Sequence, residues 1–367
     1  MKVAVVHDWL NGMRGGEHVL EAILELFPDA DLFTLFHEKG SVSPAIERHR
    51  IFTSWMQRSR FLREHYRPLL PILPLAVRSL DVRGYDLVIS SSHCVAKGVR
   101  VGSRARHISY VHAPMRYVWD RFDDYFSTDR VSSIVRLVGR LIRKPLQHWD
   151  FGVSQWPRVH ALAANSRFIA EQILRAYGRP AWVIHPFVRW EFFQKPRRSD
   201  DYYLIAGALA PYKRVDLALR AFQELGLPLR VAGSGQEEKA LRGSVATNIE
   251  FLGRVSDEEL RDLYLGARAL VFPGKEDFGI MPLEAMASGL PVIAFAAGGA
   301  LETVTDETGL LFSEQTVAGL QAAVREFEKT RSRYSEQKIR DHAARFSRRR
   351  FLEDFRTFVT AAQTTDL

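Results

Sequence analysis

The chain has 367 residues, of which 46% are apolar and 26% charged, as in an ordinary soluble globular protein. One hydrophobic core stops growing below this length, so we expect two domains. The single cysteine excludes an intramolecular disulfide framework and fits a reducing cytoplasm. No window has the apolar length of a membrane-spanning helix, and we expect no signal peptide.

Charge is distributed unevenly along the chain. Residues 1–195 contain 28 Lys and Arg against 18 Asp and Glu, whereas residues 196–367 contain 23 against 25. The basic first half predicts an anionic partner: nucleic acid, or an anionic membrane face or pyrophosphate-linked lipid. No nucleic-acid motif accompanies the charge, so a nucleic-acid binder ranks last.

The first half alternates strands with helical stretches, which is typical of a doubly wound parallel sheet. Residues 41–80 interrupt this alternation and resemble an insertion or a surface-facing lobe. Residues 131–144 interleave apolar and basic residues, which fits either an interfacial helix or a core-facing helix with solvated arginines. The strands are expected at residues 3–6, 31–36, 87–90, 108–111, 161–165 and 182–184.

A composition shift over residues 190–201, in which 195–201 have no apolar residue, indicates the hinge, so we place one domain at 1–195 and the second at 196–346. Residues 347–367 have helical spacing and form a closing helix, which we expect to pack back toward the first domain. In the second half we expect strands at 202–206, 229–232, 249–252, 269–272 and 292–295, and helices near 214–224, 257–265, 282–287 and 315–328.

Motifs in the first half are individually weak. Glycines 12, 15 and 16 join the first strand to a helix, where backbone could approach a phosphate, but the spacing fits neither the dinucleotide fingerprint nor a Walker loop. His112 and His7 end strands, where each is either a site residue or a buried, satisfied histidine. Cys94 is more simply inert packing. We expect no dedicated metal site, because no cluster of ligands has the required spacing.

The second half is more informative. Lys213 and Arg214 lie at the start of a helix, whose positive dipole end disfavours nearby cations. A bound diphosphate would compensate their positive charge. Glu276 follows a strand, and Glu284 lies on the next helix. Ligands of open parallel sheets bind at the carboxyl ends of strands, and a carboxylate there can hold sugar or ribose hydroxyls. The pair therefore predicts a site for a phosphorylated sugar.

Taken together, these motifs resemble the retaining GT-B glycosyltransferases of family four, over nearly the whole chain. The fold implied is α/β, with two Rossmann-like domains facing across a cleft. Within the family the chain looks most like the bacterial GDP-mannose-dependent mannosyltransferases of O-antigen and exopolysaccharide assembly. The resemblance rests on the Gly15-Gly16 loop, residues 110–120, residues 211–214, residues 251–255 and the Glu276-x7-Glu284 motif.

The resemblance implies roles for these residues. Lys213 would bind the donor diphosphate, Glu284 the ribose and Glu276 the transferred sugar. Catalysis would involve His112 and Glu276, with His112 lining the reaction face. The donor-binding set would be Gly15, Gly16, Lys213, Arg214, Arg254, Val255, Phe278, Gly279, Ile280 and Glu284.

The sequence departs from the family at two positions. Ala208 stands where many members have an arginine that binds the diphosphate, and Arg214 is a candidate substitute. Arg189 stands where an aspartate is common.

The function implied is transfer of a sugar, mannose from GDP-mannose, to a glycan or lipid-linked acceptor with retention of configuration in cell-surface polysaccharide synthesis. The donor would be a substrate, and no cofactor is expected. We expect a cytoplasmic protein at the inner face of the cell membrane, in peripheral contact with anionic lipid. Two alternatives stay open: a nucleotide-sugar epimerase of GT-B fold, and a non-catalytic donor-binding member of an assembly complex.

Overall fold

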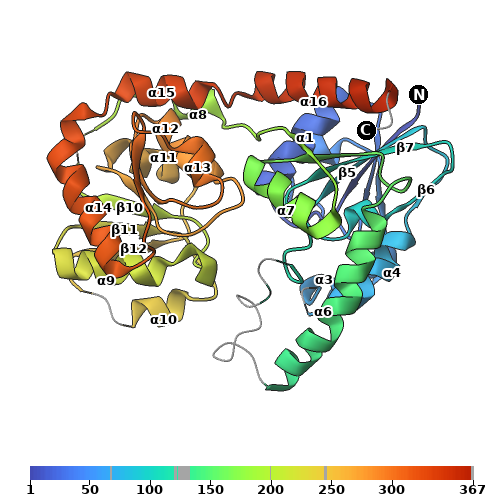
Figure 1. Cartoon of the computed structure of the whole chain (residues 1–367), viewed down its shortest axis with the longest axis horizontal. Coiled ribbons are helices and arrows are strands. Elements are labelled where there is room, and N and C mark those ends of the chain that lie inside the picture. The colour runs from blue at the N-terminus through green and yellow to red at the C-terminus, as the bar shows by residue number, and fades with distance from the viewer. Residues whose placement is uncertain (67, 120–121, 123–132, 199, 244–245, 365–367) are drawn as a thin grey trace. The chain divides into compact units, whose positions relative to one another are not determined.

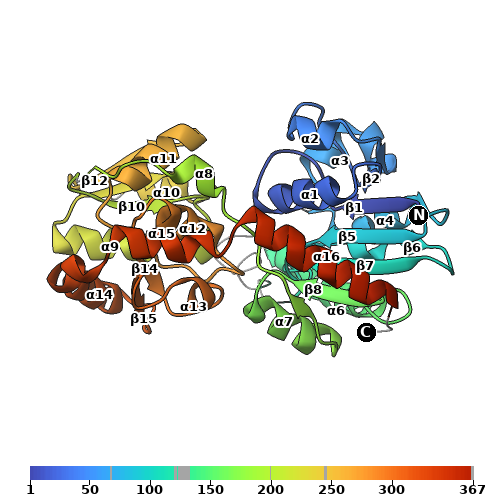
Figure 2. The same ribbon diagram turned by 90° about the horizontal axis from the view of Figure 1, so that it is seen from above.

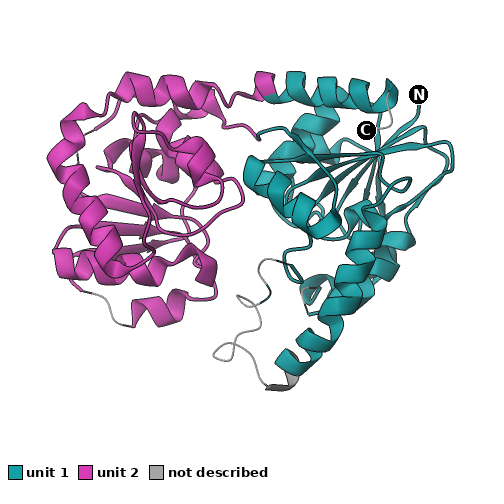
Figure 3. Cartoon of the chain, in the orientation of Figure 1, with its two compact units in different colours: residues 1–185, 351–367 teal, residues 186–350 magenta. Residues whose placement is uncertain are grey.

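The structure is a computed structural model that describes residues 1–367 except 67, 120–121, 123–132, 199, 244–245 and 365–367. Two compact units divide the chain, as Figure 3 shows: residues 1–185 with 351–367 form unit 1, and residues 186–350 form unit 2. The division after His185 precedes both the hinge expected at residues 190–201 and the boundary expected after residue 195, and the residues from Phe351 onward group with unit 1.

Unit 1 is built on a parallel sheet of seven strands, in the order β3-β2-β1-β5-β7-β8-β9. In Figures 1 and 2, α1 and α16 lie on one face of this sheet, and α4 and α6 lie on the other. The strands are β1 (Val3–His7), β2 (Asp31–Thr34), β3 (Ile51–Thr53), β5 (Leu87–Ser92), β7 (Arg106–Val111), β8 (Ala161–Ala164) and β9 (Trp182–Val183), with a separate pair β4 (Asp81–Val82) and β6 (Arg100–Val101).

The helices of unit 1 cover the sheet with apolar faces. The closing helix packs through Phe351 and Phe355, whose rings lie 5.9 and 6.2 Å from the ring of Tyr110 in β7. All three side chains are fully buried. The helices are α1 (Gly15–Leu26), α2 (Pro44–Glu47), α3 (Arg60–Glu64), α4 (Leu73–Arg78), α6 (Ser133–Val153), α7 (Arg167–Tyr177) and α16 (Arg348–Thr364), with short 3₁₀ turns η1 (Trp55–Arg58), η2 (Leu70–Ile72) and η3 (Ala96–Gly98).

Residues 41–80 contribute a strand and core side chains to unit 1, so their interpretation as an insertion or a surface-facing lobe was wrong. Strand β3 pairs with β2 in parallel, with Phe33 opposite Phe52. Met56 and Leu73 in this segment are fully buried in the main core of unit 1. Sequence periodicity missed the strand because it has only three residues, all half-buried at the edge of the sheet.

Unit 2 repeats the architecture with a parallel sheet of six strands, in the order β12-β11-β10-β13-β14-β15. The α/β class with two parallel sheets is therefore confirmed. The strands are β10 (Tyr203–Ala206), β11 (Leu229–Ala232), β12 (Ile249–Gly253), β13 (Leu270–Phe272), β14 (Val292–Phe295) and β15 (Gly309–Phe312).

Helices and short turns flank this second sheet. They are α8 (Trp190–Phe193), η4 (Pro211–Lys213), α9 (Val215–Leu225), α10 (Glu238–Arg242), α11 (Asp257–Gly266), α12 (Ile280–Ala287), α13 (Ala300–Thr303), α14 (Val317–Thr330), η5 (Arg331–Arg333) and α15 (Glu336–Ala344). Sequence analysis missed β15 and α15. Helix α15 is mostly polar and is held by Ile339, Ala343 and the buried Arg340, whose guanidinium donates to the carbonyls of Ala287 and Ser288.

Candidate functional site

The predicted residues of unit 2 gather at the carboxyl edge of its sheet. Lys213 ends η4, which follows β10, and Glu276 lies in the loop after β13. The Lys213 ammonium forms an ion pair with the Glu276 carboxylate, and both side chains are largely buried. The two groups that sequence analysis assigned to diphosphate and sugar are therefore neighbours in the fold.

Glycines explain how these loops come so close. A Cβ at Gly274 would stand 2.6 Å from the Tyr212 carbonyl oxygen and 2.7 Å from Lys213 Cα. Gly298, at φ +65°, pairs with Glu276 in an isolated parallel bridge, and a Cβ there would stand 2.1 Å from the Glu276 carbonyl oxygen. Any larger residue would separate the backbone segments that carry the ion pair.

Arg214 has an unusual backbone conformation. Among the described residues it is the one non-glycine with positive φ (φ 51°, ψ 41°), directly before α9. Its guanidinium is held by Asp216 Oδ1 at 3.2 Å and Gln315 Oε1 at 3.4 Å. A non-glycine residue in this conformation costs about 1 to 2 kcal/mol, and such strain is typical of functional positions.

Helix α12 brings the remaining motif residues to the same edge. Gly279, at φ +87°, is its N-cap, and Ile280 begins the helix, so the first turn has N–H groups without intrahelical partners. Phe278 is buried, with its ring 5.9 Å from that of Phe346. A helix N-terminus flanked by a lysine favours an anionic ligand.

Glu284 lies on α12 and contacts Tyr264, whose hydroxyl donates to Oε2 at 3.4 Å. Burial raises the pKa of Glu284 to about 7, and nearby Arg189 opposes this shift. Arg189 itself pairs with Asp257 at 2.8 Å, at the start of α11. The arginine at this unusual position thus lies among the charges that act on Glu284.

Arg254 and Val255 follow β12, between Gly253 at φ +70° and the N-cap Ser256 of α11. Arg254 is exposed, while Val255 packs on the core of unit 2. Both lie at the carboxyl edge of the sheet.

In unit 1, Gly15 and Gly16 begin helix α1. Arg14 is the N-cap residue, and its backbone N–H donates to Glu17 Oε2 at 3.0 Å. A Cβ at Gly16 would lie 3.8 Å from the rings of His112 and His7. Gly16 therefore borders the two strand-end histidines.

His112 follows β7 and is held on two sides. Its Nε2 lies 2.8 Å from Ser91 Oγ, and its carbonyl accepts from Asn165 Nδ2 at 3.0 Å. Burial, together with the neighbouring His7 and His93, lowers the pKa of His112 to about 3, so the ring is neutral at pH 7. Gly15, Gly16 and His112 are thus brought together at the carboxyl edge of the unit 1 sheet.

Sequence analysis missed Asp8, which immediately follows His7. Its buried carboxylate accepts four backbone N–H groups, from residues 93–96, at 2.6 to 3.0 Å. Burial alone would raise the pKa of Asp8. The nearby His93 and His7 and these N–H groups together outweigh burial, so the pKa lies below its usual value. Asp8 therefore fixes the loop after β5. Its position at the end of a predicted strand was the one signal in the sequence that could have pointed to it.

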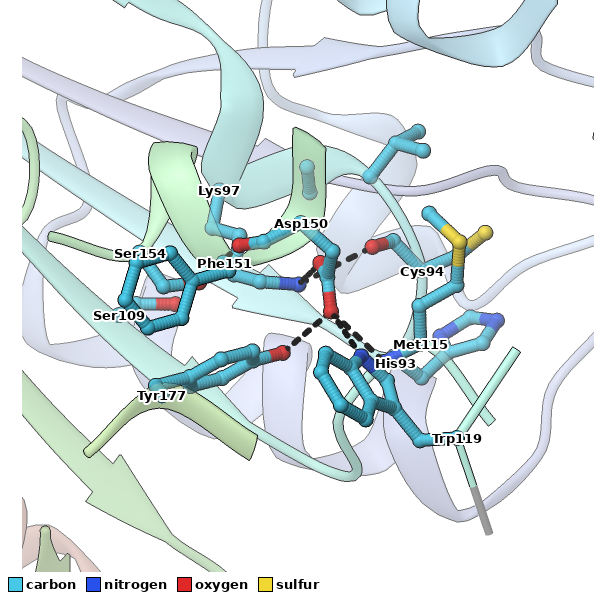
Figure 4. Close-up of polar contacts among 12 residues, drawn as sticks. His93, Cys94, Lys97, Ser109, Met115, Trp119, Asp150, Phe151, Ser154 and Tyr177 are labelled. Carbon is cyan, nitrogen blue, oxygen red and sulfur yellow. Dashed lines mark hydrogen bonds and ion pairs between the residues drawn. The ribbon is translucent and has the colours of Figure 1, made fainter. Parts of the chain in front are cut away.

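A second buried network, centred on Asp150, also contacts the loop after β5. In Figure 4 the Asp150 carboxylate lies between Lys97, Trp119 and Tyr177. Lys97 Nζ is 2.6 Å from Asp150 Oδ1 and donates to the Cys94 carbonyl at 3.1 Å, while Trp119 and Tyr177 donate to Oδ2. Burial raises the pKa of the Cys94 thiol well above its usual value, which agrees with its interpretation as inert packing.

Comparison with known proteins gives a family match in the second half of the chain. Residues 188–346 match the family model described as "Glycosyl transferases group 1". Glycogen synthase of Mycobacterium tuberculosis is 32% identical over 192 residues, which cover 49% of this chain and 45% of that protein.

A GDP-mannose-dependent monoacylated alpha-(1-6)-phosphatidylinositol monomannoside mannosyltransferase of Corynebacterium glutamicum is also similar. It is 35% identical over 119 residues, which cover 28% of this chain and 31% of that protein. The chain therefore matches less than half the length of these curated relatives.

Among solved structures, Anabaena HepE in complex with UDP superposes with a TM-score of 0.69 over 98% of this chain and 100% of that one. The sequence identity is 16%, so the likeness concerns the fold alone. It confirms the GT-B fold that the sequence predicted.

Proposed function

We propose that the protein is a retaining hexosyltransferase, because residues 188–346 match the model of the group 1 glycosyl transferases and the chain has the GT-B fold. It transfers mannose from GDP-mannose to a hydroxyl of a glycan or lipid-linked acceptor in the synthesis of a cell-surface polysaccharide. The observation that carries the proposal is the Lys213–Glu276 pair beside the N-terminus of α12.

The chemistry follows from these groups. Transfer breaks the bond between the anomeric carbon and the diphosphate oxygen, and forms a bond from the acceptor oxygen on the same face. Lys213 and the α12 N-terminus stabilise the departing diphosphate as preorganised positive charge. Glu276 orients the sugar through its hydroxyls, and the acceptor proton passes to a diphosphate oxygen. Glu284 accepts hydrogen bonds from the ribose.

Arg214 supplies the second cation in place of the missing arginine at position 208. Its guanidinium donates hydrogen bonds to Asp216 and Gln315, and Arg214 directly follows Lys213 in the sequence. Binding of a diphosphate gives this side chain an alternative anionic partner. The strained conformation holds it at the carboxyl edge of the sheet.

The donor is tested by thermal shift and calorimetric titration with GDP-mannose, UDP-glucose, UDP-galactose and the free nucleotides. Binding to the folded state raises the melting temperature, by an amount set by the ratio of ligand concentration to Kd. GDP-mannose is expected to give the largest shift. If none of the nucleotide sugars binds or is turned over, the proposal is wrong.

Product analysis separates transfer from its alternatives. Incubation with GDP-mannose and lipid-linked oligosaccharide is expected to give an α-linked product. A changed sugar released without an acceptor would identify an epimerase. Donor binding with no product, and full cellular function of the Lys213→Ala variant, would identify a donor-binding assembly member.

We also propose that the protein lies at the inner face of the cell membrane, where its acceptor would be, and that helix α6 contacts anionic lipid there. No helix among the described residues is long and apolar enough to cross a membrane. The inward side of α6 packs Leu146 and Ile142 on the core, whereas Leu137, Val138 and Leu141 are 59%, 48% and 66% exposed.

The basic residues of α6 lie beside this apolar stripe. Arg140 and Lys144 are exposed, and with Arg136 they follow one another at intervals of one helical turn. An apolar stripe flanked by cations fits the boundary between anionic headgroups and acyl chains. Of the two interpretations that the sequence left open, these exposures support the interfacial one.

Vesicle flotation tests this surface. The wild-type protein is expected to float with vesicles containing phosphatidylglycerol but not with pure phosphatidylcholine. The Leu137→Asn/Leu141→Asn variant should lose binding. Leu174→Asn on α7 is the matched control, because Leu174 is 54% exposed on another helix of unit 1. Equal flotation of both variants would contradict the lipid-binding role of this stripe. Dimerisation of the wild type through Leu137 would instead show that the stripe binds a second copy of the chain.

A further inference from the structure

Gln315 joins two loops of unit 2 that carry residues of the expected donor-binding set. Its side-chain N–H donates to the carbonyl of Pro273 at 2.8 Å, in the loop that follows β13 and contains Glu276. Its side-chain carbonyl accepts from Arg214 Nη1 at 3.4 Å, directly before α9. All of these residues belong to unit 2. One uncharged side chain therefore ties Arg214 to the loop of Glu276.

The chemistry of the two partners determines how the amide of Gln315 is turned. The guanidinium of Arg214 has N–H donors and no acceptor, whereas the Pro273 carbonyl can only accept. The amide oxygen must therefore face Arg214, and the amide nitrogen must face Pro273. A side chain that ends in donors alone or in acceptors alone would satisfy one of these partners and repel the other.

The segment that carries Gln315 is itself fixed by a helix cap. Thr316 is the N-cap residue of α14, and its hydroxyl accepts from the Gly319 N–H at 3.0 Å. The Thr316 N–H donates to the Glu314 carbonyl at 2.7 Å. Gln315 thus lies on a short, hydrogen-bonded connection between β15 and α14, and its side chain is partly buried. Such support is what allows one side chain to hold another in place.

Arg214 is held by three hydrogen bonds and still has N–H donors for a ligand. Its Nε and Nη2 donate to the two carboxylate oxygens of Asp216 at 3.2 and 3.4 Å, and its Nη1 donates to Gln315. A guanidinium has five N–H bonds, so these contacts leave one on Nη1 and one on Nη2. Phosphate oxygens are strong acceptors for such donors.

We propose that Gln315 is a positioning residue, which holds the guanidinium of Arg214 beside the loop of Glu276 so that Arg214 can bind the diphosphate of the donor. The inference rests on the proposed function for the identity of the ligand, and on the two hydrogen bonds of Gln315 for its geometry. Because Gln315 is uncharged, it fixes the guanidinium without neutralising it. Without Gln315, Asp216 alone would determine where the guanidinium lies.

Helix α14 supplies a matched control. Gln321 Nε2 donates to Glu224 Oε2 at 2.7 Å and joins α14 to α9. Like Gln315 it is an amide that connects two segments of unit 2, but Glu224 lies near the last residue of α9, whereas Arg214 precedes the first. Gln321→Met and Gln315→Met therefore make the same chemical change at opposite ends of α9.

Calorimetric titration with GDP, UDP and inorganic pyrophosphate measures binding of a diphosphate. Gln315→Met should raise the Kd of pyrophosphate and of the better-bound nucleotide roughly fivefold, the scale of one lost hydrogen bond to a charged group. Gln315→Glu should raise both values further, because its carboxylate pairs with the guanidinium and repels the Pro273 carbonyl. Gln321→Met should leave the affinities as in the wild type, even where it lowers the melting temperature.

A double-mutant cycle separates positioning from a general loss of structure. If Gln315 acts through Arg214, the effect of Gln315→Met on Kd should fall below about twofold in the Arg214→Gly background, because the residue that it positions is absent. Equal effects in the two backgrounds, or equal losses in Gln315→Met and Gln321→Met, would overturn the proposal. If Gln315→Met does not fold, the same cycle with Gln315→Glu decides.

The two proposals fail separately. If a diphosphate binds with this coupling between Gln315 and Arg214 but no sugar is transferred, only the proposed function is wrong. If sugar is transferred and Gln315→Met binds the diphosphate as the wild type does, only the positioning role is wrong. If the wild type binds neither pyrophosphate nor a nucleoside diphosphate, the diphosphate site is wrong and both proposals fall with it.

Discussion

Lys213 and Glu276 form an ion pair although they follow different strands, β10 and β13, and are separated by 62 intervening residues. Gly274 and Gly298 make the approach possible, because each leaves space that a side chain would fill with a neighbouring backbone. The pair therefore holds the cation and the carboxylate that are proposed to bind diphosphate and sugar in one place before the donor arrives.

The first prediction concerns this cation. Lys213→Ala should lower kcat/KM for the donor by about 10² to 10³-fold, the scale of losing one preorganised group that stabilises developing charge. It also leaves the Glu276 carboxylate largely buried without its partner, so stability should fall as well. Steady-state kinetics and thermal melting measure the two effects.

The control for this prediction is Lys338→Ala in the same unit. Lys338 pairs with Glu307 at 2.8 Å, but both side chains are more than 60% exposed, at 63% and 67%. A surface pair contributes little, so this variant should keep its activity and melting temperature. Similar activity losses in the two lysine variants would contradict a diphosphate role for Lys213.

The second prediction concerns Glu284. Its folded-state pKa of about 7 exceeds the ordinary value of 4.5, so its contribution to stability is present below pH 4.5 and is lost as the pH rises through 7. Glu284→Gln should therefore raise the melting temperature at pH 8 by roughly 2 to 4 °C and leave it unchanged near pH 4. Melting curves across this range provide the measurement.

The affinity for the donor nucleotide should change with pH in the opposite direction to the stability, and increase as the pH rises. In its proposed role an ionised Glu284 accepts hydrogen bonds from the ribose, so the wild-type affinity for GDP should increase as the pH rises from 6 to 8. Glu284→Gln should bind GDP more weakly and with a flat pH profile, as measured by calorimetry. A wild-type affinity that does not change with pH would argue against Glu284 as the ribose ligand.

The third prediction concerns Gly16. A methyl group there would lie in ordinary contact with the His112 and His7 rings, 3.8 Å away, so the fold has room for it. Alanine is also preferred over glycine within a helix by about 0.5 to 1 kcal/mol. Gly16→Ala should therefore keep or raise the melting temperature. If Gly16 belongs to the donor-binding set that the resemblance implies, the added methyl should also increase the donor KM roughly tenfold or more. Unchanged KM would remove Gly16 from the donor-binding set.

The fourth prediction concerns Arg214. Replacing it by glycine relieves the left-handed strain, so stability should be maintained or increased even though the contact with Asp216 is lost. If Arg214 replaces the missing arginine at position 208, donor affinity should still fall about tenfold. Arg220→Ala, an exposed arginine of α9, is the control in the same binding assay. Full affinity in Arg214→Gly would show that Lys213 acts without a second cation.

Much of the fold could be predicted because strand and helix patterns are local. The apolar runs 229–232 and 292–295 match β11 and β14 residue for residue, and the loop position of Glu276 and the helical position of Glu284 are as predicted. Strands β3 and β15 and helix α15 were missed. Their sequences are short, half-buried or polar, and only packing against neighbours stabilises them.

The sequence by itself determined the α/β class, the two-part organisation and the positions of the motif residues at strand ends, since these follow from periodicity and turn chemistry. Only the tertiary structure decided which side chains meet. Residues from separate strands are joined by the ion pair of Lys213 with Glu276, by the hydrogen bonds of Asp8 to residues 93–96, and by the contact of Ser91 with His112. The physical reason is that the order of strands in a sheet, which no local pattern encodes, determines which loops become neighbours.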